Sequence, residues 1–260
     1  MQVYRGMDIG TAKATPAERA AVPHHLLDLA DPGDDFSVAA FQTAGQAALA
    51  AIAARGHRAV LVGGTGLYLR ALVDGLRLPG RYPSVRAALE AEADTPALHA
   101  RLAGLDPEAA ARMEPGNRRR VVRALEVTLG SGRPFSSYGP GLDAYPPSPV
   151  VHVGLRPPLD VLDRRIEERV LTMVADGFLD EVRRLPRPLS RTAAQALGYR
   201  ELLAHVDGDL TLDRAVADTI LRTRQFARRQ LRWFRRDPRV HWWDTGSRPP
   251  DALGDWRRCN

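Results

Sequence analysis

Residues 59–62, Ala-Val-Leu-Val, run directly into the turn Gly-Gly-Thr-Gly at 63–66. An unbroken apolar run of this length is typical of a strand that is buried on both faces. The glycines allow a sharp turn, and a helical pattern begins near Leu67. A buried strand, a glycine turn and a helix in this order predict a parallel sheet covered by helices, which is an α/β fold.

Further α/β segments are predicted on either side of this turn. Residues 24–29 read as a short strand, and Ser37 is a suitable N-cap for a helix of about 17 residues that Gly56 ends. Residues 150–155 return to a strand pattern. A long helix with a buried apolar stripe is predicted over about 212–236.

The middle of the chain lacks strand patterns. Short helices are predicted there at 85–93, 95–104, 107–113 and 117–129, before a loop rich in Gly, Ser and Pro. We therefore expect an α/β core made of 1–78 and 139–245, a helical insertion at 79–138 and a tail at 246–260.

Composition narrows the class of protein. The 260 residues carry a net charge of +6, and Lys13 is the only lysine. No apolar stretch is long enough to span a membrane, and the N-terminus lacks the pattern of a signal peptide. The single cysteine, Cys259, excludes a disulfide within the chain. We expect a cytoplasmic protein without a membrane partner.

Two clusters of arginines predict a nucleic-acid partner. In the first, Arg119, Arg120 and Arg123 are spaced so that they project together from a helix. In the second, arginines recur at helical spacing with Gln225, Gln230 and Trp233 between them, which favours an RNA backbone. The second cluster comprises Arg222, Arg224, Arg228, Arg229, Arg232, Arg235 and Arg236. The alternative for both clusters is a solvated helix face.

A third pair of arginines, Arg165 and Arg169, shares a helical face and is spaced to hold a diphosphate. Surface ion pairs with Glu167 and Glu168 are the alternative. The adjacent residues His24 and His25 would point to opposite faces of a strand. With no Cys/His cluster to support them, we expect no zinc site.

Six segments, in this order along the chain, resemble one family closely. They are residues 2–13, 23–28, 61–68, 120–126, 195–201 and 228–234. Together these segments resemble the tRNA dimethylallyltransferases, also called tRNA isopentenyltransferases. The resemblance implies a P-loop-kinase-like parallel sheet with a helical insertion.

The same resemblance implies a reaction. A dimethylallyl group passes from dimethylallyl diphosphate to the exocyclic N6 of adenosine 37, in tRNAs that read codons beginning with U. Mg²⁺ assists departure of the diphosphate, and the target base is flipped out of its stack. The partners are the anticodon stem-loop of tRNA and the prenyl diphosphate, and the enzyme is expected to be a monomer.

The resemblance assigns roles to residues of this sequence. Thr65 is the catalytic residue, placed beside the target adenine, and Gln2 and Arg86 contact the tRNA. The remaining tRNA-binding residues are Arg119, Arg120, Arg123, Gln195, Gly198, Tyr199, Arg200, Arg228, Arg229, Gln230, Arg232, Trp233 and Arg235.

One departure from the family concerns the N-terminus. Family members carry a first strand, a phosphate loop ending in Gly-Lys-Ser/Thr and the aspartate that acts as general base before the position of Met1. We therefore expect no metal ligand within this chain, and we expect the chain as written to be inactive and poorly stable. A misassigned start site or a truncated chain is the favoured explanation, a genuine short form is the alternative, and in-frame codons upstream of Met1 would distinguish them. Two other functions remain as alternatives to the transferase: a non-catalytic tRNA-binding remnant and a small-molecule kinase of related fold.

Overall fold

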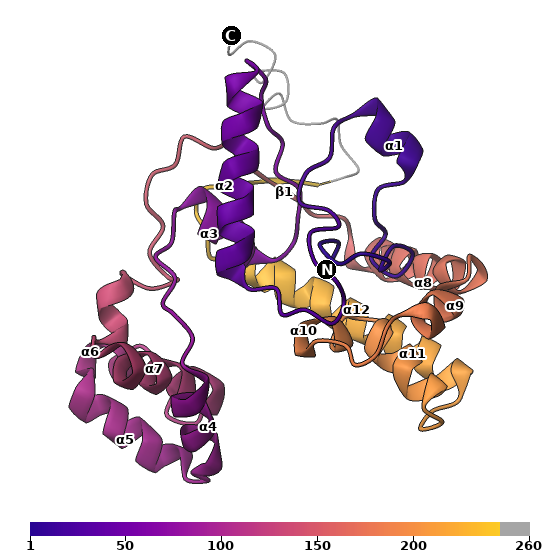
Figure 1. Ribbon diagram of the computed structural model, residues 1–260. Coiled ribbons are helices and arrows are strands. Elements are labelled where there is room, and N and C mark those ends of the chain that lie inside the picture. Colours follow the sequence, from indigo (N-terminus) through magenta and orange to yellow (C-terminus); the bar gives the residue numbers. More distant parts are fainter. Residues whose placement is uncertain (245–260) are drawn as a thin grey trace. The chain divides into compact units, whose positions relative to one another are not determined.

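The computed structural model describes residues 1–244, and Figure 1 shows their course. The chain divides into two compact units, Asp74–Pro147 and a larger one made of Met1–Val73 with Ser148–Asn260. The larger unit combines helices with a parallel sheet, as predicted for the α/β core.

The larger unit is mostly helical. Its helices are α1 Pro16–Ala21, α2 Val38–Ala54, α3 Gly66–Val73, α8 Leu159–Ala175, α9 Phe178–Arg184, α10 Arg191–Ala194, α11 Tyr199–Val206 and α12 Leu212–Phe234. Helix α12 packs against α3, α8 and α11, and its colour in Figure 1 makes it easy to follow. Segments far apart in the sequence are thereby joined along one helix.

Within residues 1–244, the sheet of the larger unit has two strands. β1 His152–Leu155 pairs in parallel with β2 Val240–Trp243, in the register His152↔Val240 to Leu155↔Trp243. The strand predicted at 150–155 is confirmed over these residues. A single isolated parallel bridge joins Tyr4 to Ala30.

Two predicted strands are wrong. Residues 59–62 form no strand, and Val60 and Val62 are 70% and 87% exposed. A strand is held by hydrogen bonds to neighbouring strands, and within residues 1–244 this run has no partner strand. Residues 24–29 are irregular because Leu26 and Asp28 have φ of 65° and 56°, which breaks an extended course.

The helix predicted after Ser37 is confirmed as α2. The Ser37 side chain accepts a hydrogen bond from the N–H of Ala40, which satisfies one of the free donors at the helix start. Gly56 follows the helix with φ of 70°. Gly45 is the buried residue of α2, and a Cβ there would lie 3.0 Å from Leu72, so α2 and α3 pack closely at this point.

The core of the larger unit lies between the N-terminal segment and helices α9 to α11. The rings of Phe178 and Tyr199 meet edge to face, with centroids 4.9 Å apart. The side chains around them are fully buried or nearly so. They are Tyr4, Met7, Ala30, Val182, Leu185, Ala193, Ala196, Leu202 and Ala215. Residues from the first ten positions thus share a core with residues beyond 175.

The smaller unit has its own apolar core. Its helices are α4 Pro83–Ala91, α5 Thr95–Leu105, α6 Pro107–Ala111 and α7 Arg118–Ser131, with the 3₁₀ helix η1 Phe135–Tyr138. Leu98, Leu102, Val121 and Leu125 are fully buried there. Asp94, Asp106 and Asn117 cap three of the helices with side-chain hydrogen bonds. In neither unit does a described helix have the length and apolar character to cross a membrane.

Candidate functional site

The glycine turn at 63–66 presents Thr65 at the start of α3. The Thr65 residue is exposed, and its carbonyl accepts the N–H groups of Tyr68 at 3.0 Å and Leu69 at 3.1 Å. The preceding carbonyl, of Gly64, accepts a hydrogen bond of 2.9 Å from Nε2 of Gln230 in α12. The turn is therefore held from two sides while the threonine faces solvent.

Helix α12 explains why this turn contains glycines. A Cβ on Gly66 would lie 1.8 Å from Nε1 of Trp233, and one on Gly64 would lie 2.0 Å from Nε2 of Gln230. At Gly64 and Gly66 the space beside the backbone is filled by side chains of α12, so these two glycines allow the helix to approach closely.

The N-terminal segment is held in place by Glu181, a residue that no sequence motif singles out. Its buried carboxylate accepts the backbone N–H groups of Asp8 at 2.9 Å, Ile9 at 2.7 Å and Gly10 at 3.2 Å. The Tyr199 hydroxyl donates to the same carboxylate at 2.6 Å. Burial, with this hydrogen bond, raises the pKa of Tyr199 well above its ordinary value.

The segment is also held from within by Lys13. Its Nζ lies 2.5 Å from the carboxylate of Asp8 and 2.6 Å from that of Asp28, and it donates to the carbonyl of Tyr4 at 2.7 Å. The Lys13 side chain is 1% exposed. Partial burial would raise the pKa of Asp28, but hydrogen bonds from Lys13 and Arg19 outweigh it and lower that pKa.

The side chain of Gln2 joins the two ends of the same N-terminal segment. Its side-chain amide donates to the carbonyls of Thr11 at 3.1 Å and Ala12 at 2.9 Å. The predicted contact of Gln2 with tRNA therefore competes with an internal role for the amide N–H groups.

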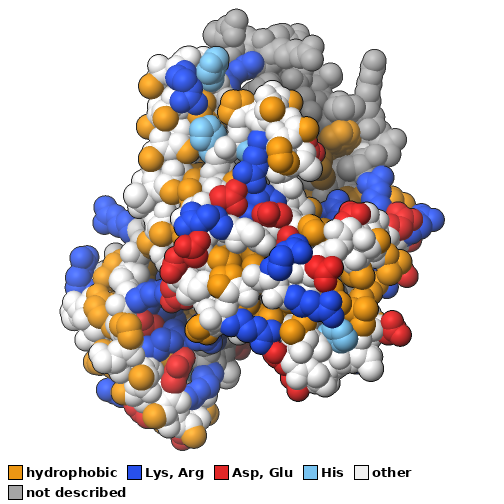
Figure 2. Space-filling view, turned by 45° about the vertical axis from the view of Figure 1, so that its right-hand side comes forward, with side chains coloured by type: hydrophobic (Ala, Val, Ile, Leu, Met, Phe, Trp, Pro, Cys, Tyr) orange, Lys and Arg blue, Asp and Glu red, His pale blue; other side chains and the backbone are white. Residues whose placement is uncertain are grey.

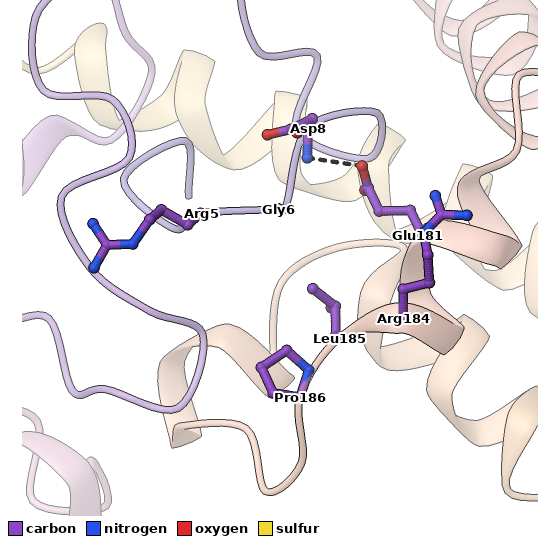
Figure 3. Close-up of a pocket in the computed structure, with 7 residues that line it drawn as sticks. All are labelled: Arg5, Gly6, Asp8, Glu181, Arg184, Leu185 and Pro186. Atoms are coloured by element: carbon purple, nitrogen blue, oxygen red, sulfur yellow. Dashed lines mark hydrogen bonds between the residues drawn. The ribbon is translucent and has the colours of Figure 1, made fainter.

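A cavity of about 230 Å³ lies beside this segment. Figure 3 shows Arg5 and Arg184 on opposite sides of it, and the dashed bond from the N–H of Asp8 to Glu181 at its edge. Arg5 also pairs with Asp31 at 2.6 Å. The cavity is lined by both signs of charge, so it does not define the charge of a ligand.

The arginines of α12 fall into two groups. Arg228 forms a two-pronged pair with Asp163 at 3.0 and 2.7 Å, and Arg224 pairs with Glu167 at 2.6 Å. Arg222 pairs with the buried Glu201 at 3.2 Å. These three arginines join α12 to α8 and α11, so the predicted stripe is partly neutralised.

The second group remains exposed on the same helix. Arg229 lies over the ring of Phe226 at 5.7 Å, and Arg232 and Arg235 have no acidic partner within residues 1–244. Figure 2 shows acidic and basic side chains interspersed across the face in view, rather than an unbroken basic surface. The cations of α12 that remain for a polyanion are therefore Arg229, Arg232 and Arg235.

In the smaller unit, Arg86 and Arg123 share one buried carboxylate. Glu126 lies 3.2 Å from Arg86 and 2.9 Å from Arg123, and it accepts the N–H of Tyr82 at 2.9 Å. Burial would raise the Glu126 pKa, but the hydrogen bonds from Tyr82 and Arg123, with the charges of Arg123 and Arg86, lower it. Arg86 and Arg123 are thus structural partners here, while Arg119 and Arg120 are exposed.

The predicted tRNA-binding stretch at 195–200 contains both exposed and buried residues. Gln195 and Arg200 are exposed, whereas Gly198 and Tyr199 are buried. The expectation that the Tyr199 side chain contacts RNA is corrected, because its ring lies in the core and its hydroxyl is bonded to Glu181. Gly198, with φ of 82°, begins α11, and a Cβ there would lie 2.7 Å from Phe178.

The predicted diphosphate pair, Arg165 and Arg169, is exposed on α8. Glu167, the ion-pair partner considered from the sequence, pairs with Arg224 instead. Residues 1–244 contain no group of three or more His, Cys, Asp or Glu that would hold a metal ion. Asp8 and Asp28 both pair with Lys13.

Comparison with known proteins identifies the chain. A family described as IPP transferase matches residues 2–237, which makes the protein a prenyl-group transferase by class. It is 53% identical over 259 residues to the tRNA dimethylallyltransferase of Kineococcus radiotolerans, covering 96% of this chain and 81% of that protein. The corresponding protein of Streptomyces coelicolor is 50% identical, with 95% and 80% covered. The chain belongs to the tRNA dimethylallyltransferase family.

Solved structures agree with this assignment. The full-length tRNA isopentenylpyrophosphate transferase of Bacillus halodurans superposes with a TM-score of 0.68 at 39% identity, covering 99% of this chain and 83% of that one. The enzyme of Staphylococcus epidermidis gives 0.66 at 31% identity, with 99% and 86% covered. A eukaryotic dimethylallyltransferase that acts on tRNA gives 0.77 at 24% identity, with 99% and 69% covered, and supports the fold alone. The P-loop-kinase-like fold class is confirmed.

Proposed function

We propose that this protein prenylates tRNA, transferring a dimethylallyl group from dimethylallyl diphosphate to N6 of adenosine 37 in tRNAs that read codons beginning with U. Family membership supports the chemistry. The observation that carries the proposal is the exposed Thr65, held at the start of α3 next to a helix that bears exposed arginines.

In the proposed reaction the adenine N6 forms a bond to the allylic carbon while the bond from that carbon to the diphosphate oxygen breaks. The amine gives up one proton, which the departing diphosphate takes up, so the products are N6-prenylated adenosine and hydrogen diphosphate. The Thr65 hydroxyl is suited to accept or donate a hydrogen bond at the amine and so to orient it in line with the carbon. The leaving diphosphate carries negative charge, which guanidinium groups neutralise through two-pronged hydrogen bonds.

The proposed tRNA-contacting residues are exposed in each unit taken by itself. In the larger unit they are Gln195, Arg200, Arg229, Arg232 and Arg235, and in the smaller unit they are Arg119 and Arg120. Arg165 and Arg169 remain the proposed diphosphate contacts because both are exposed and one turn apart on α8. The Mg²⁺ expected from the resemblance stays a prediction, and no step is assigned to it.

Two readouts on the 260-residue chain test the proposal. Binding of tRNA is measured over a range of salt concentrations, and transfer of a labelled dimethylallyl group is measured to tRNA carrying adenosine or guanosine at position 37. We expect salt-dependent binding, because each phosphate contact releases counterions. Transfer only to the adenosine substrate supports the reaction and overturns the expectation of an inactive chain. Binding without transfer restricts the function to tRNA binding, and no binding contradicts both.

A further inference from the structure

We propose that Gln230 is a positioning residue for Thr65, and that it acts by holding the carbonyl of Gly64 rather than by touching RNA. The role assigned to Thr65 rests on the proposed function. That α12 sets the conformation of the glycine turn follows from the structure alone.

Gln230 holds the peptide unit between Gly64 and Thr65. A peptide bond is planar, so the Gly64 oxygen, the Thr65 nitrogen and the Thr65 Cα lie in one plane. The hydrogen bond of 2.9 Å from Gln230 Nε2 to that oxygen therefore fixes the direction in which the Thr65 Cα is presented.

The start of α3 holds the backbone on the other side of Thr65. Its own carbonyl accepts the N–H groups of Tyr68 and Leu69 as α3 begins, so the following peptide unit is also held. With both flanking peptide planes fixed, the Thr65 side chain keeps rotation about its own χ1 as its main freedom. A hydroxyl on such a support is placed more narrowly than one on an open loop.

Helix α12 approaches the glycine turn closely. The lack of a Cβ at Gly64 and Gly66 leaves room for Gln230 and Trp233, whose nearest atoms would lie 2.0 and 1.8 Å from an added Cβ. Gln230 and Trp233 are one helical turn apart and so share a face of α12. Arg229 and Arg232, which immediately precede them in sequence, are exposed. One helix thus supports the turn and presents exposed cations.

The test compares Gln230→Ala with Gln225→Ala in the full chain. Gln225 lies on the same helix but is exposed, and it serves as the matched control. We expect amide hydrogen exchange over residues 64–69 to accelerate by about fivefold in Gln230→Ala, the effect of losing one ordinary hydrogen bond. Gln225→Ala is expected to leave the rates unchanged. Unchanged rates in Gln230→Ala would overturn the inference.

A second variant approaches the contact from the other side. In Gly64→Ala the new Cβ displaces the end of the Gln230 side chain, so we expect the same faster exchange. In the Gln230→Ala background the obstacle is gone, and Gly64→Ala is expected to add nothing further. Additive effects of the two changes would show that they act independently and would contradict the inference.

Kinetics separate positioning from RNA contact. With Thr65 misplaced, we expect kcat to fall about tenfold in Gln230→Ala while KM for tRNA changes by less than about twofold. A raised KM with unchanged kcat would restore Gln230 as an RNA-contacting residue and refute the inference. If the unaltered chain transfers no prenyl group, the proposed reaction fails, and hydrogen exchange still decides whether Gln230 holds the turn.

Discussion

The hydroxyl of Tyr199 donates a hydrogen bond of 2.6 Å to the carboxylate of Glu181. The same carboxylate accepts three successive backbone N–H groups from Asp8 to Gly10. One side chain of α9 thereby joins α11 to the start of the chain. A buried carboxylate without hydrogen-bond donors destabilises the folded state by several kcal/mol, so these bonds together stabilise Glu181 in its buried position.

Glu181→Gln is expected to lower the free energy of unfolding by roughly 2–3 kcal/mol. An amide keeps one acceptor oxygen and turns its NH₂ toward backbone N–H groups, so two donors lose their partner. Tyr199→Phe removes a single bond and should cost less, about 1.5 kcal/mol. Urea unfolding measures both. Glu168→Gln, at an exposed position of α8, is the control, and an equal loss there would contradict the assignment.

Gly10→Ala is expected to destabilise the larger unit by roughly 1–3 kcal/mol. A Cβ at this position would lie 2.1 Å from the ring of Phe178 and 2.7 Å from that of Tyr199. Gly104→Ala in α5 meets nothing within 4 Å and should instead stabilise the helix by about 0.5–1 kcal/mol. Thermal unfolding distinguishes the two. An unchanged unfolding temperature in Gly10→Ala would contradict this prediction and show that the rings of Phe178 and Tyr199 move aside.

The smaller unit should lose stability in acid through Glu126. The folded-state pKa of this carboxyl lies below its ordinary value of 4.5, so its contribution is complete above that value. It is lost as pH falls through 4.5 and then through the folded pKa. Hydrogen exchange of α4 and α7 amides, measured at decreasing pH, follows the loss.

Glu126→Gln should remove most of this pH dependence. It leaves Arg86 and Arg123 without their shared carboxylate, and we expect a cost of roughly 3 kcal/mol at neutral pH. Glu114→Gln, at an exposed position of the same unit, is the control. A Glu126→Gln variant that keeps the full acid sensitivity would place its origin elsewhere.

The arginines of α12 should separate into two phenotypes. Arg232→Ala and Arg235→Ala are expected to weaken tRNA binding and each to lower the salt slope of log K by about 1. Arg228→Ala, which breaks the pair with Asp163, is expected mainly to change stability, by about 0.5 kcal/mol. Fluorescence anisotropy at several salt concentrations, with urea unfolding, checks both. A larger loss of salt slope in Arg228→Ala than in Arg232→Ala would reverse the division.

Local signals predicted part of the fold correctly. Ser37 and Gly56 bound α2 as expected, since a cap and a stop act on neighbouring backbone groups. The apolar run at 59–62 did not form a strand, because strand formation depends on partners that a local pattern does not supply. Apolar character alone therefore predicts burial at Val60 and Val62, which are among the most exposed of the large hydrophobic residues described.

The site was predictable only where helical spacing decides the outcome. Spacing placed the arginines of α12 on shared faces, but it does not reveal which face meets the carboxylates of α8. Local spacing also does not identify Glu181, because the N–H of Asp8 that it binds is 173 positions away in sequence. The family resemblance predicts RNA contacts at Gln230 and Trp233, and in the structure both side chains pack against glycines of the turn.

The enclosure of Lys13 has a practical consequence for chemical probing. As the only lysine, it carries the only ε-amine of the chain, and its side chain is 1% exposed among Asp8, Asp28 and the Tyr4 carbonyl. Acylating reagents should therefore modify the native protein at its α-amino group alone. A second acyl group, detected by mass spectrometry, would appear only when the N-terminal segment opens, so its rate of appearance reports that opening at a single atom.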